Sequence, residues 1–455
     1  MNEFLLSSQK GKIERIVFYL LALFLPTQLG KHFWPEFSTV LGIRIDYLSP
    51  TIFFTDILVM LLFVFWALRK FGKKTNKNSN FEILASRRSG RNSKFQDVST
   101  KLIPLLIFIL LVNVFTQRYI ASGLYSLLKL LEMSFVAYYI AKFITEKAIH
   151  QKLYIIFCIG IIFQSLLAIA QYFQQGSVGG ILYFLGERYF NASTPGIANA
   201  SINGELILRP YGTFPHPNVL AGYILIGMIL ITFSSRKLDS HIVKKLKYIA
   251  ILLGTIVLFL SMSRISIILW VFIVSYHLIV DVKKRLLSLI FFGIILIFLI
   301  TPFASRFTKV NLAEEAIVQR KILIESSIKI IKINPYFGVG LGNFLPTLSK
   351  LQNPLSLGLY LQPVHNIFLL ITAEIGIIGF GIFVWFLRKT FINIMNIESK
   401  IRKPQFFALG AILILGLVDH YWLTLQQGQL LFAYVIGLCW ANIKTPFKSP
   451  RVEKF

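Results

Sequence analysis

The chain has 455 residues, of which 55% are hydrophobic, and its mean hydropathy is +0.68. Soluble domains contain about 45–50% apolar residues. The excess in this chain is concentrated in blocks of about 15–25 residues, each long enough to cross a bilayer core as a helix. Because backbone polar groups find no water inside a bilayer, such blocks must be helical. The composition therefore excludes a soluble globular domain.

The net charge is +27, from 47 Lys and Arg against 20 Asp and Glu. A charge of this size is typical of nucleic-acid-binding proteins. The basic residues, however, lie between the apolar blocks, as expected for residues that set membrane topology and contact anionic headgroups. We therefore expect membrane lipids and no nucleic acid as partners. The two cysteines, Cys158 and Cys439, lie inside apolar blocks, so neither a disulfide framework nor a cysteine metal site is expected.

The apolar blocks predict an all-α, polytopic integral membrane protein with about twelve transmembrane helices, and ten if neighbouring blocks merge. We expect the whole chain, 1–455, to form one polytopic membrane domain. The first block has no clear small-residue cleavage site behind it, so we interpret it as a membrane span. The approximate cores of the spans are 13–29, 51–68, 102–117, 121–143, 153–173, 217–234, 247–262, 265–281, 286–302, 366–387, 405–418 and 424–441.

Alternate loops contain most of the Lys and Arg residues, and this asymmetry orients the chain. Both termini are predicted to be cytoplasmic, in a protein of the cytoplasmic membrane. Segment 69–101 has ten basic residues and is rich in Ser, Asn and Gly. We expect it to be a disordered cytoplasmic linker that contacts lipid, and a partner-binding role stays open.

One long loop, 303–365, is predicted to lie on the outer face. Residues 312–333 have apolar residues at helical spacing with charges between them, which predicts an amphipathic helix that lies on the membrane or caps a cavity. Gly338, Gly340 and Gly342 follow. No βαβ unit surrounds these glycines, so we interpret them as a tight turn with close backbone packing rather than a nucleotide-binding loop.

A polar cluster precedes the span at 217–234. His216 is followed by Pro217, a residue suited to the first position of a helix, so His216 and Asn218 are expected at a helix N-terminus. Such a terminus favours anions, and Arg209 adds a planar guanidinium that matches phosphate. An arginine that snorkels beside an ordinary capped helix is the alternative, and the local residues do not decide between the two.

Two further clusters lie beside later spans. Arg264 ends a short outer turn and is either an interfacial anchor or a phosphate ligand. His365 and Asn366 lie where the chain returns to the membrane, and an imidazole with a pKa near 6.5 can exchange a proton at working pH. A histidine at a helix start is also commonly a simple hydrogen-bonding group. Within the fourth span, Lys129 and Glu132 are spaced to pair with each other.

Asp419 lies in the last outer turn, before Tyr421 and Trp422. It either orients a histidine or a substrate sugar, or belongs to an aromatic belt at the membrane interface, which we favour slightly. No HExxH motif, cysteine pair or outer Asp-x-Asp pair is present, so neither a metal nor a cofactor is expected. A serine-hydrolase elbow, GxSxG, is also absent.

In their order along the chain, these motifs resemble the O-antigen ligase/polymerase family over roughly residues 10–440. Each motif is weak alone, and the ordered set is specific to the family. The matching runs are Arg209-Pro-Tyr-Gly-Thr-Phe-x-His-Pro-Asn218, Ser261-x-Ser-Arg264, Asn334-Pro-x-x-Gly-Val-Gly-x-Gly-Asn343-Phe, and His365-Asn366-x-Phe-Leu with Glu374 beyond it.

The resemblance implies a metal-independent, inverting glycosyltransferase that moves a glycan from undecaprenyl diphosphate to a hydroxyl of a lipid, glycan or protein acceptor. In the family, two outer-face arginines hold the diphosphate and a histidine of the large loop acts on the acceptor. His365 occupies the position of that histidine and is the expected catalytic base. The expected substrate-binding residues are Arg209, Arg264, His216, Asn218, Asn366 and Asp419.

Several functions share these features. A ligase, a glycan polymerase and a protein O-oligosaccharyltransferase would use nearly the same chemistry and differ in the acceptor. A polysaccharide transporter or flippase is a further alternative. Transporters place ionisable residues near the bilayer midplane and show internal repeats. Here the notable charges cluster at the outer ends and no repeat is evident, which favours the transferases.

Overall fold

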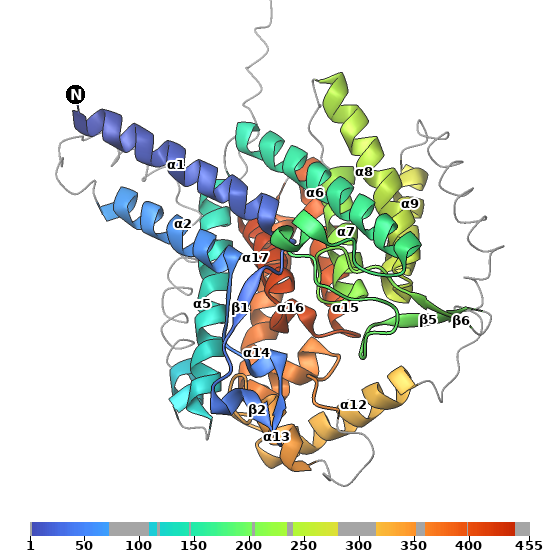
Figure 1. Ribbon diagram of the computed structural model, residues 1–455. Helices are drawn as coiled ribbons and strands as arrows, with labels where there is room; N and C mark the ends of the chain where they lie inside the picture. Colours follow the sequence, from blue (N-terminus) through green and yellow to red (C-terminus); the bar gives the residue numbers. More distant parts are fainter. Residues whose placement is uncertain are drawn as a thin grey trace, which may run out of the picture.

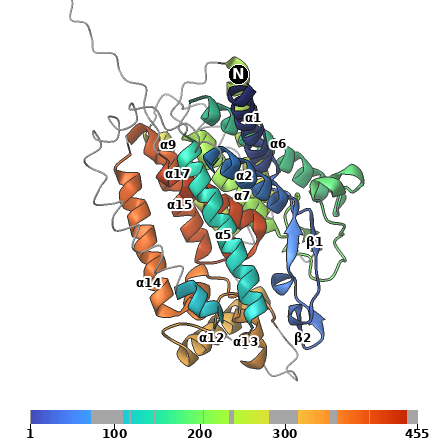
Figure 2. The same ribbon diagram turned by 90° about the vertical axis from the view of Figure 1, so that its left-hand side faces the viewer.

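The computed structural model describes residues 2–71, 109–115, 119–144, 147–202, 205–233, 240–280, 315–351, 360–397 and 399–441. Within these ranges the chain is mostly helical, as predicted. The long helices form a bundle, and α12 and α13 lie at the end of the bundle opposite the N-terminus (Figures 1 and 2). The predicted linker at 69–101 lies almost entirely outside the described residues, as does the predicted span at 286–302.

The described helices follow the apolar blocks. Of the predicted span at 102–117, only residues 109–115 are described, and they are helical. Before the long outer loop, the helices are α1 (Asn2–Phe24), α2 (Phe54–Phe71), α5 (Ile120–Phe143), α6 (Lys147–Gln174), α7 (Pro217–Thr232), α8 (His241–Leu260) and α9 (Arg264–Val280). From that loop onward, they are α12 (Glu315–Ile333), α13 (Phe344–Leu351), α14 (Ile367–Met395), α15 (Ser399–Gly416), α16 (Tyr421–Thr424) and α17 (Gln426–Trp440).

Three described helices are long and apolar enough to cross a membrane: Ile120–Phe143, Ile149–Gln174 and Ile367–Met395. Two shorter apolar helices are Pro217–Thr232 and Arg264–His277. These helices agree with a membrane protein. The number of twelve spans and the cytoplasmic placement of both termini stay predictions.

Short strands, which the sequence did not predict, occur in the loops that were predicted to lie on the outer face. β1 (Gly30–His32) pairs with β4 (Thr51–Phe53), β2 (Thr39–Val40) with β3 (Ile43–Arg44), and β5 (Asn199–Ile202) with β6 (Glu205–Leu208), each antiparallel. Single-turn helices η1 (Glu36–Ser38) and η2 (Asp46–Leu48) lie between β1 and β4, and η3 (Gly180–Leu185) follows α6. Pairing satisfies backbone groups that these loops would otherwise leave unbonded.

The centre of the bundle is α7, which is buried along nearly its whole length. It packs against α6, α8, α9, α15 and α17 (Figure 1). Glycines of α7 allow this close packing, because a Cβ on Gly222 would meet the side chain of Tyr421 and one on Gly227 would meet that of Ile161. The N-terminus of α7, capped by His216, is consequently held in the middle of the protein.

Two groups of buried charges connect the helices. Arg69 of α2 forms an ion pair with Glu14 of α1 at 2.6 Å. Lys129 of α5 bonds Asp56 of α2 at 2.7 Å and the predicted partner Glu132 at 3.3 Å. The ammonium of Lys129 also donates to the side-chain oxygen of Gln426 on α17 at 3.0 Å. One lysine therefore joins three helices.

We expect Lys129→Ala to destabilise the protein by about 3–5 kcal/mol, because two largely buried carboxylates lose their cation. Lys245→Ala, at an exposed position of α8, is the matched control and should change stability by less than about 0.5 kcal/mol. The measurement is the free energy of unfolding in detergent. Equal free energies of unfolding for the two variants would contradict the buried network. A double variant, Lys129→Ala with Asp56→Asn, that regains part of the lost free energy of unfolding would support it.

Candidate active site

The glycine-rich loop fills a break in α14. At Gly376 the helix is interrupted, with a backbone φ of +69°. The amides of Val339 and Gly340 donate to the carbonyl oxygens of Ala373 and Glu374, both at 2.9 Å. A Cβ on Gly376 would collide with the carbonyl oxygen of Tyr336. The predicted tight turn with close backbone packing is therefore confirmed.

Asn113 fastens this loop from the other side. Its side-chain amide donates to the carbonyl of Phe337 at 2.8 Å, and its side-chain oxygen accepts from the amide of Leu341 at 2.8 Å. Asn113 is 3% exposed. The loop is thus bonded to α14 and to the helical segment at 109–115, and it anchors one end of the outer loop whose other end carries His365.

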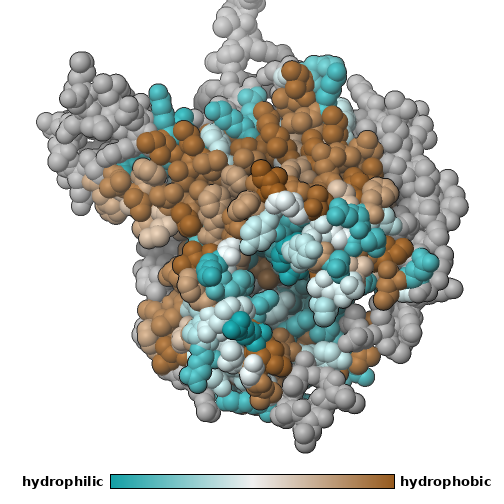
Figure 3. Space-filling model, viewed as in Figure 1, coloured by the Kyte–Doolittle hydropathy of each residue, from teal (hydrophilic) through white to brown (hydrophobic). Residues whose placement is uncertain are grey.

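A continuous cavity of about 2780 Å³ is lined by the loops and the outer ends of the helices. Figure 3 shows hydrophilic residues gathered in a hollow in the middle of one face, below the mainly hydrophobic surface of the upper helices. Six of the seven predicted site residues line the cavity: Arg209, His216, Asn218, Arg264, His365 and Asp419. Four separate segments of the chain supply these six residues, so the fold brings residues that are distant in the sequence into one cavity.

A chain of hydrogen bonds runs beneath the cavity. Arg209 is 7% exposed. Its Nε donates to the carbonyl oxygen of Ser261 at 2.7 Å and its Nη2 to Oδ1 of Asn218 at 2.7 Å. Asn218 Nδ2 in turn donates to Oδ2 of Asp419 at 2.9 Å. This Arg209–Asn218–Asp419 chain connects the start of α7 with the turn between α8 and α9 and the turn between α15 and α16.

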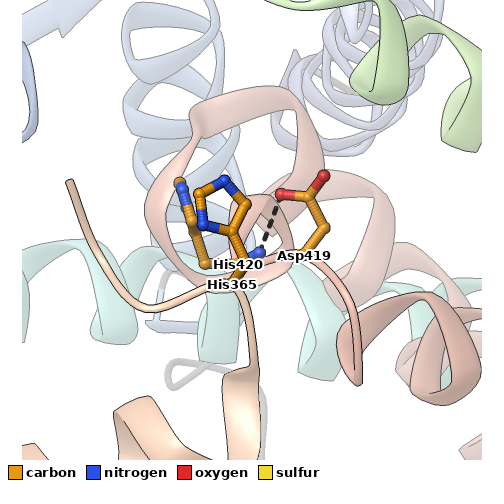
Figure 4. Close-up of side chains that lie close together, drawn as sticks. All are labelled: His365, Asp419 and His420. Atoms are coloured by element: carbon orange, nitrogen blue, oxygen red, sulfur yellow. Dashed lines mark hydrogen bonds between the residues drawn. The ribbon is translucent and has the colours of Figure 1, made fainter. Parts of the chain in front are cut away.

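His365, Asp419 and His420 point toward one another (Figure 4). The two imidazole rings meet edge to face with their centroids 4.9 Å apart. One nitrogen from each ring and one carboxylate oxygen lie within 4.8 Å of one another. The amide of His420 donates to Oδ1 of Asp419 at 2.9 Å. Tyr47 packs edge to face against His420, with ring centroids 5.3 Å apart.

The turn that carries Asp419 is buried inside the protein. Asp419 is 8% exposed and His420 is 3% exposed. Tyr421 and Trp422 are 2% and 0% exposed. The favoured interpretation of these two aromatic residues as an interfacial belt is therefore wrong, because neither side chain reaches the protein surface. Asp419 instead lies in the wall of the cavity, where it can act on a neighbouring histidine.

Burial controls the charge of these groups. It lowers the pKa of His365 below its ordinary value; Asp419 opposes this effect and Arg320 adds to it. Burial also lowers the pKa of His420 to about 3. The imidazoles are consequently neutral at pH 7. Burial alone would raise the pKa of Asp419, but the adjacent histidines and the hydrogen bond from Asn218 bring it below its usual value, so this carboxylate is ionised.

Two of the predicted residues serve as helix caps. His216 Nδ1 accepts a hydrogen bond from the amide of Asn218 at 3.1 Å. Burial, with the nearby Arg209, lowers the pKa of His216 to about 3. Asn366 Oδ1 accepts from the amides of Phe368 and Leu369 and thereby caps α14.

Asn366 is absent from the described wall of the cavity. Its side-chain amide donates to the carbonyl of Leu417, beside the turn of Asp419, at 3.2 Å. The contacts of Asn366 in the structure are those of a helix cap beside His365, and its predicted role in substrate binding stays a prediction.

The sequence analysis did not single out several residues of the cavity wall, among them Tyr47, Arg188 and Arg320. Tyr47 belongs to η2, between the first two predicted spans, in a segment for which the sequence predicted no role. Arg188 lies in the outer loop after α6. Arg320 belongs to the amphipathic helix, where its charge was attributed to a solvated face. The sequence held one signal for Arg320, the alternation of charged and apolar residues in α12. That pattern does not determine whether a given charged side chain points into the cavity or into solvent.

The cavity continues as an apolar groove along the bundle. Helices α5 and α14 each pack against α17, which lies between them (Figure 2). Ser134 and Ala137 of α5 line this part of the cavity. The larger apolar residues that line this part are Met133, Ile378, Ile382, Phe386, Phe432 and Ile436.

The fold and the cavity indicate a membrane protein whose site combines the buried Arg209, the half-buried Arg264, neutral histidines and the carboxylate of Asp419. Residues 249–384 match the family model described as O-antigen ligase, so this part of the chain is similar to that family. The matched region includes Arg264 and His365. A search of the curated proteins found no match.

We expect Gly376→Ala to destabilise the protein by at least about 2 kcal/mol, because alanine at this positive φ is strained and its Cβ meets the backbone of the glycine loop. Gly410→Ala in α15 is the control, since a Cβ there meets nothing within 4 Å. The control should be neutral or slightly stabilising. Thermal unfolding in detergent gives both values, and an unchanged midpoint for Gly376→Ala would contradict the packing described for this break.

Proposed function

We propose that the protein is an O-antigen ligase-like transferase that moves a glycan from undecaprenyl diphosphate to an acceptor hydroxyl on the outer face of the cytoplasmic membrane. The observation that carries the proposal is one cavity that holds Arg209, Arg264 and His365 together. Guanidinium groups match diphosphate, and a neutral imidazole can accept a proton. The family match supports the same class of substrate.

In the proposed reaction, His365 accepts the proton of the acceptor hydroxyl while the hydroxyl oxygen attacks the anomeric carbon. The bond from that carbon to the diphosphate oxygen breaks, and its electron pair leaves with the diphosphate. Arg209 and Arg264 offset the negative charge that develops on the leaving group. A single displacement of this kind inverts the anomeric centre.

Asp419 supports the base. The ionised carboxylate lies within 4.8 Å of a ring nitrogen of His365. A small movement would bring the two into a hydrogen bond, which stabilises the imidazolium that forms in the reaction. Asn218 holds Asp419 with one side-chain group and Arg209 with the other. The side chain of Asn218 therefore holds both Asp419, which supports the base, and Arg209, which faces the leaving group.

The apolar groove provides a place for the polyprenyl chain of the donor. It is continuous with the part of the cavity that contains Arg209 and Arg264. A lipid diphosphate has an anionic head joined to a long apolar tail, and the cavity has a cationic end joined to an apolar groove. This correspondence supports a lipid-linked donor over a soluble sugar nucleotide.

We propose that the reaction needs no metal ion. His365, Asp419 and His420 are residue types that bind metals and lie close enough to share one. Arg209, Arg264 and Arg320 line the same cavity, however, and their charges oppose the binding of a further cation. Diphosphate is already a good leaving group, and the arginines supply the compensating charge.

The acceptor decides between a ligase, a polymerase and a protein O-oligosaccharyltransferase. All three would use the same cavity, so the size and composition of the product separate them. A transporter would carry the glycan across the membrane without forming a bond, and the same vesicle assay detects this outcome.

The test is glycan transfer in reconstituted vesicles, with lipid-diphosphate glycan extracted from the source cells. We expect His365→Ala to lower the transfer rate by about 10²–10⁴-fold, because the general base is lost. Arg209→Gln and Arg264→Gln should lower it by about 10²-fold or more, because a charge that stabilises the leaving group is lost. His241→Ala, at an exposed position at the start of α8, is the control.

Wild-type transfer is expected to persist in excess EDTA. Full activity of His365→Ala, with folding intact, would show that the base is misassigned. Glycan that crosses the membrane without bond formation would place the protein among the transporters.

The pH dependence gives a separate check. Because the pKa of His365 is lowered, we expect kcat/KM to fall on the acid side only below about pH 6.5, where the base becomes protonated. Asp419→Asn should move this acid limb to still lower pH, since Asp419 raises the pKa. Arg320→Gln should move it to higher pH. An acid limb above pH 7 that neither variant shifts would contradict the role of His365.

A further inference from the structure

Two arginines of the cavity are not assigned to the diphosphate or to the acceptor hydroxyl in the proposed reaction. Arg188 and Arg320 line the same cavity as Arg209 and Arg264. Unlike Arg209, both are exposed, and the hydrogen bonds that hold Asn218 and Asp419 do not involve them. The Arg209–Asn218–Asp419 chain would remain complete without them, so a purely structural role does not explain their position.

Arg188 is held at the rim of the cavity. Its Nη2 donates to the carbonyl oxygen of Pro215 at 3.0 Å. Its guanidinium lies 5.5 Å from the centre of the Tyr211 ring. These contacts direct the arginine toward the segment that carries His216, and they leave the other donors of its guanidinium available to a ligand.

Arg320 reaches the cavity from α12. It lies close enough to His365 and His420 to contribute to the lowering of both pKa values. In the part of the chain that the structure describes, neither Arg320 nor Arg188 has a carboxylate within ion-pairing distance. Arg320 therefore lies near His365 and His420, Arg188 lies beside the segment of Pro215 and His216, and neither charge is paired with a described carboxylate.

The charge of the cavity exceeds what a diphosphate requires. Arg209 and Arg264 suffice to offset the leaving group in the proposed reaction. Arg188 and Arg320 add two further guanidinium groups on other parts of the wall. Guanidinium groups bind carboxylate and phosphate in a bidentate geometry. A neutral sugar would leave both arginines without an anionic partner.

We propose that Arg188 and Arg320 bind a second anionic group, a carboxylate or a phosphate carried by a glycan substrate, so that the enzyme selects acidic glycans. The inference rests on the proposed transferase function. The anion belongs either to the glycan of the donor or to the acceptor, and the two sources are separated by experiment.

The experiment uses three synthetic polyprenyl-diphosphate disaccharides that differ only in the terminal sugar: a hexose, a hexuronic acid or a hexose phosphate. A second arm places the same three sugars at the end of the acceptor.

In one of the two arms, wild type is expected to show a kcat/KM about tenfold or more higher for the acidic substrates. Arg188→Gln and Arg320→Gln should each reduce this preference several-fold while the rate with the neutral sugar changes little. Lys321→Gln, an exposed neighbour on α12 outside the cavity wall, should keep the preference.

Equal kcat/KM for the three sugars in both arms would overturn the inference and leave the proposed function standing. A preference that survives in both arginine variants would overturn it as well, because the selection would then come from other residues. Absence of transfer with every substrate in wild type would overturn the proposed function, and the inference with it.

Discussion

The buried hydrogen bonds among Arg209, Asn218 and Asp419 determine where the other groups of the site lie. A guanidinium and a carboxylate cannot be buried in a membrane protein without partners, because desolvation of an unpaired charge is very unfavourable. One amide side chain satisfies both: its oxygen faces the arginine and its nitrogen faces the aspartate. The start of α7 and the turn after α15 are consequently held at a fixed distance. The backbone amide of His420 donates to Asp419, and this bond holds His420 next to the carboxylate.

His365 reaches this centre by a different route. The outer loop is fastened at the break in α14, where backbone amides of the glycine run replace the missing helical hydrogen bonds. The glycines are required there because the backbones approach too closely for a Cβ. The loop then returns to Asn366, whose side chain caps α14 and holds the turn of Asp419. His365 is thus positioned by backbone geometry on one side and by a helix cap on the other.

The sequence predicted the class of protein because bilayer insertion imposes a strong, local constraint on composition. It also singled out Arg209, Arg264 and His365, which line one cavity in the structure, because they lie in motifs whose order resembles a family. The sequence does not separate the two possible roles of Asn366, because a capping residue and a ligand can have the same residue type at the same helix position. The burial of Tyr421 and Trp422 depends on packing between α15 and α17, which no local pattern records. The same reason explains why Arg188, Arg320 and the strands around η2 were missed.

The groove between α5 and α14 has a kinetic consequence. Helix α5 packs mainly against α17, whereas α14 packs against α12, α15 and α17, so the lipid-linked donor proposed above would arrive sideways by diffusion within the leaflet. Its supply then depends on the number of molecules per unit of membrane area rather than on any aqueous concentration. Turnover would respond to dilution of the donor with inert lipid and stay constant when the volume of surrounding buffer changes.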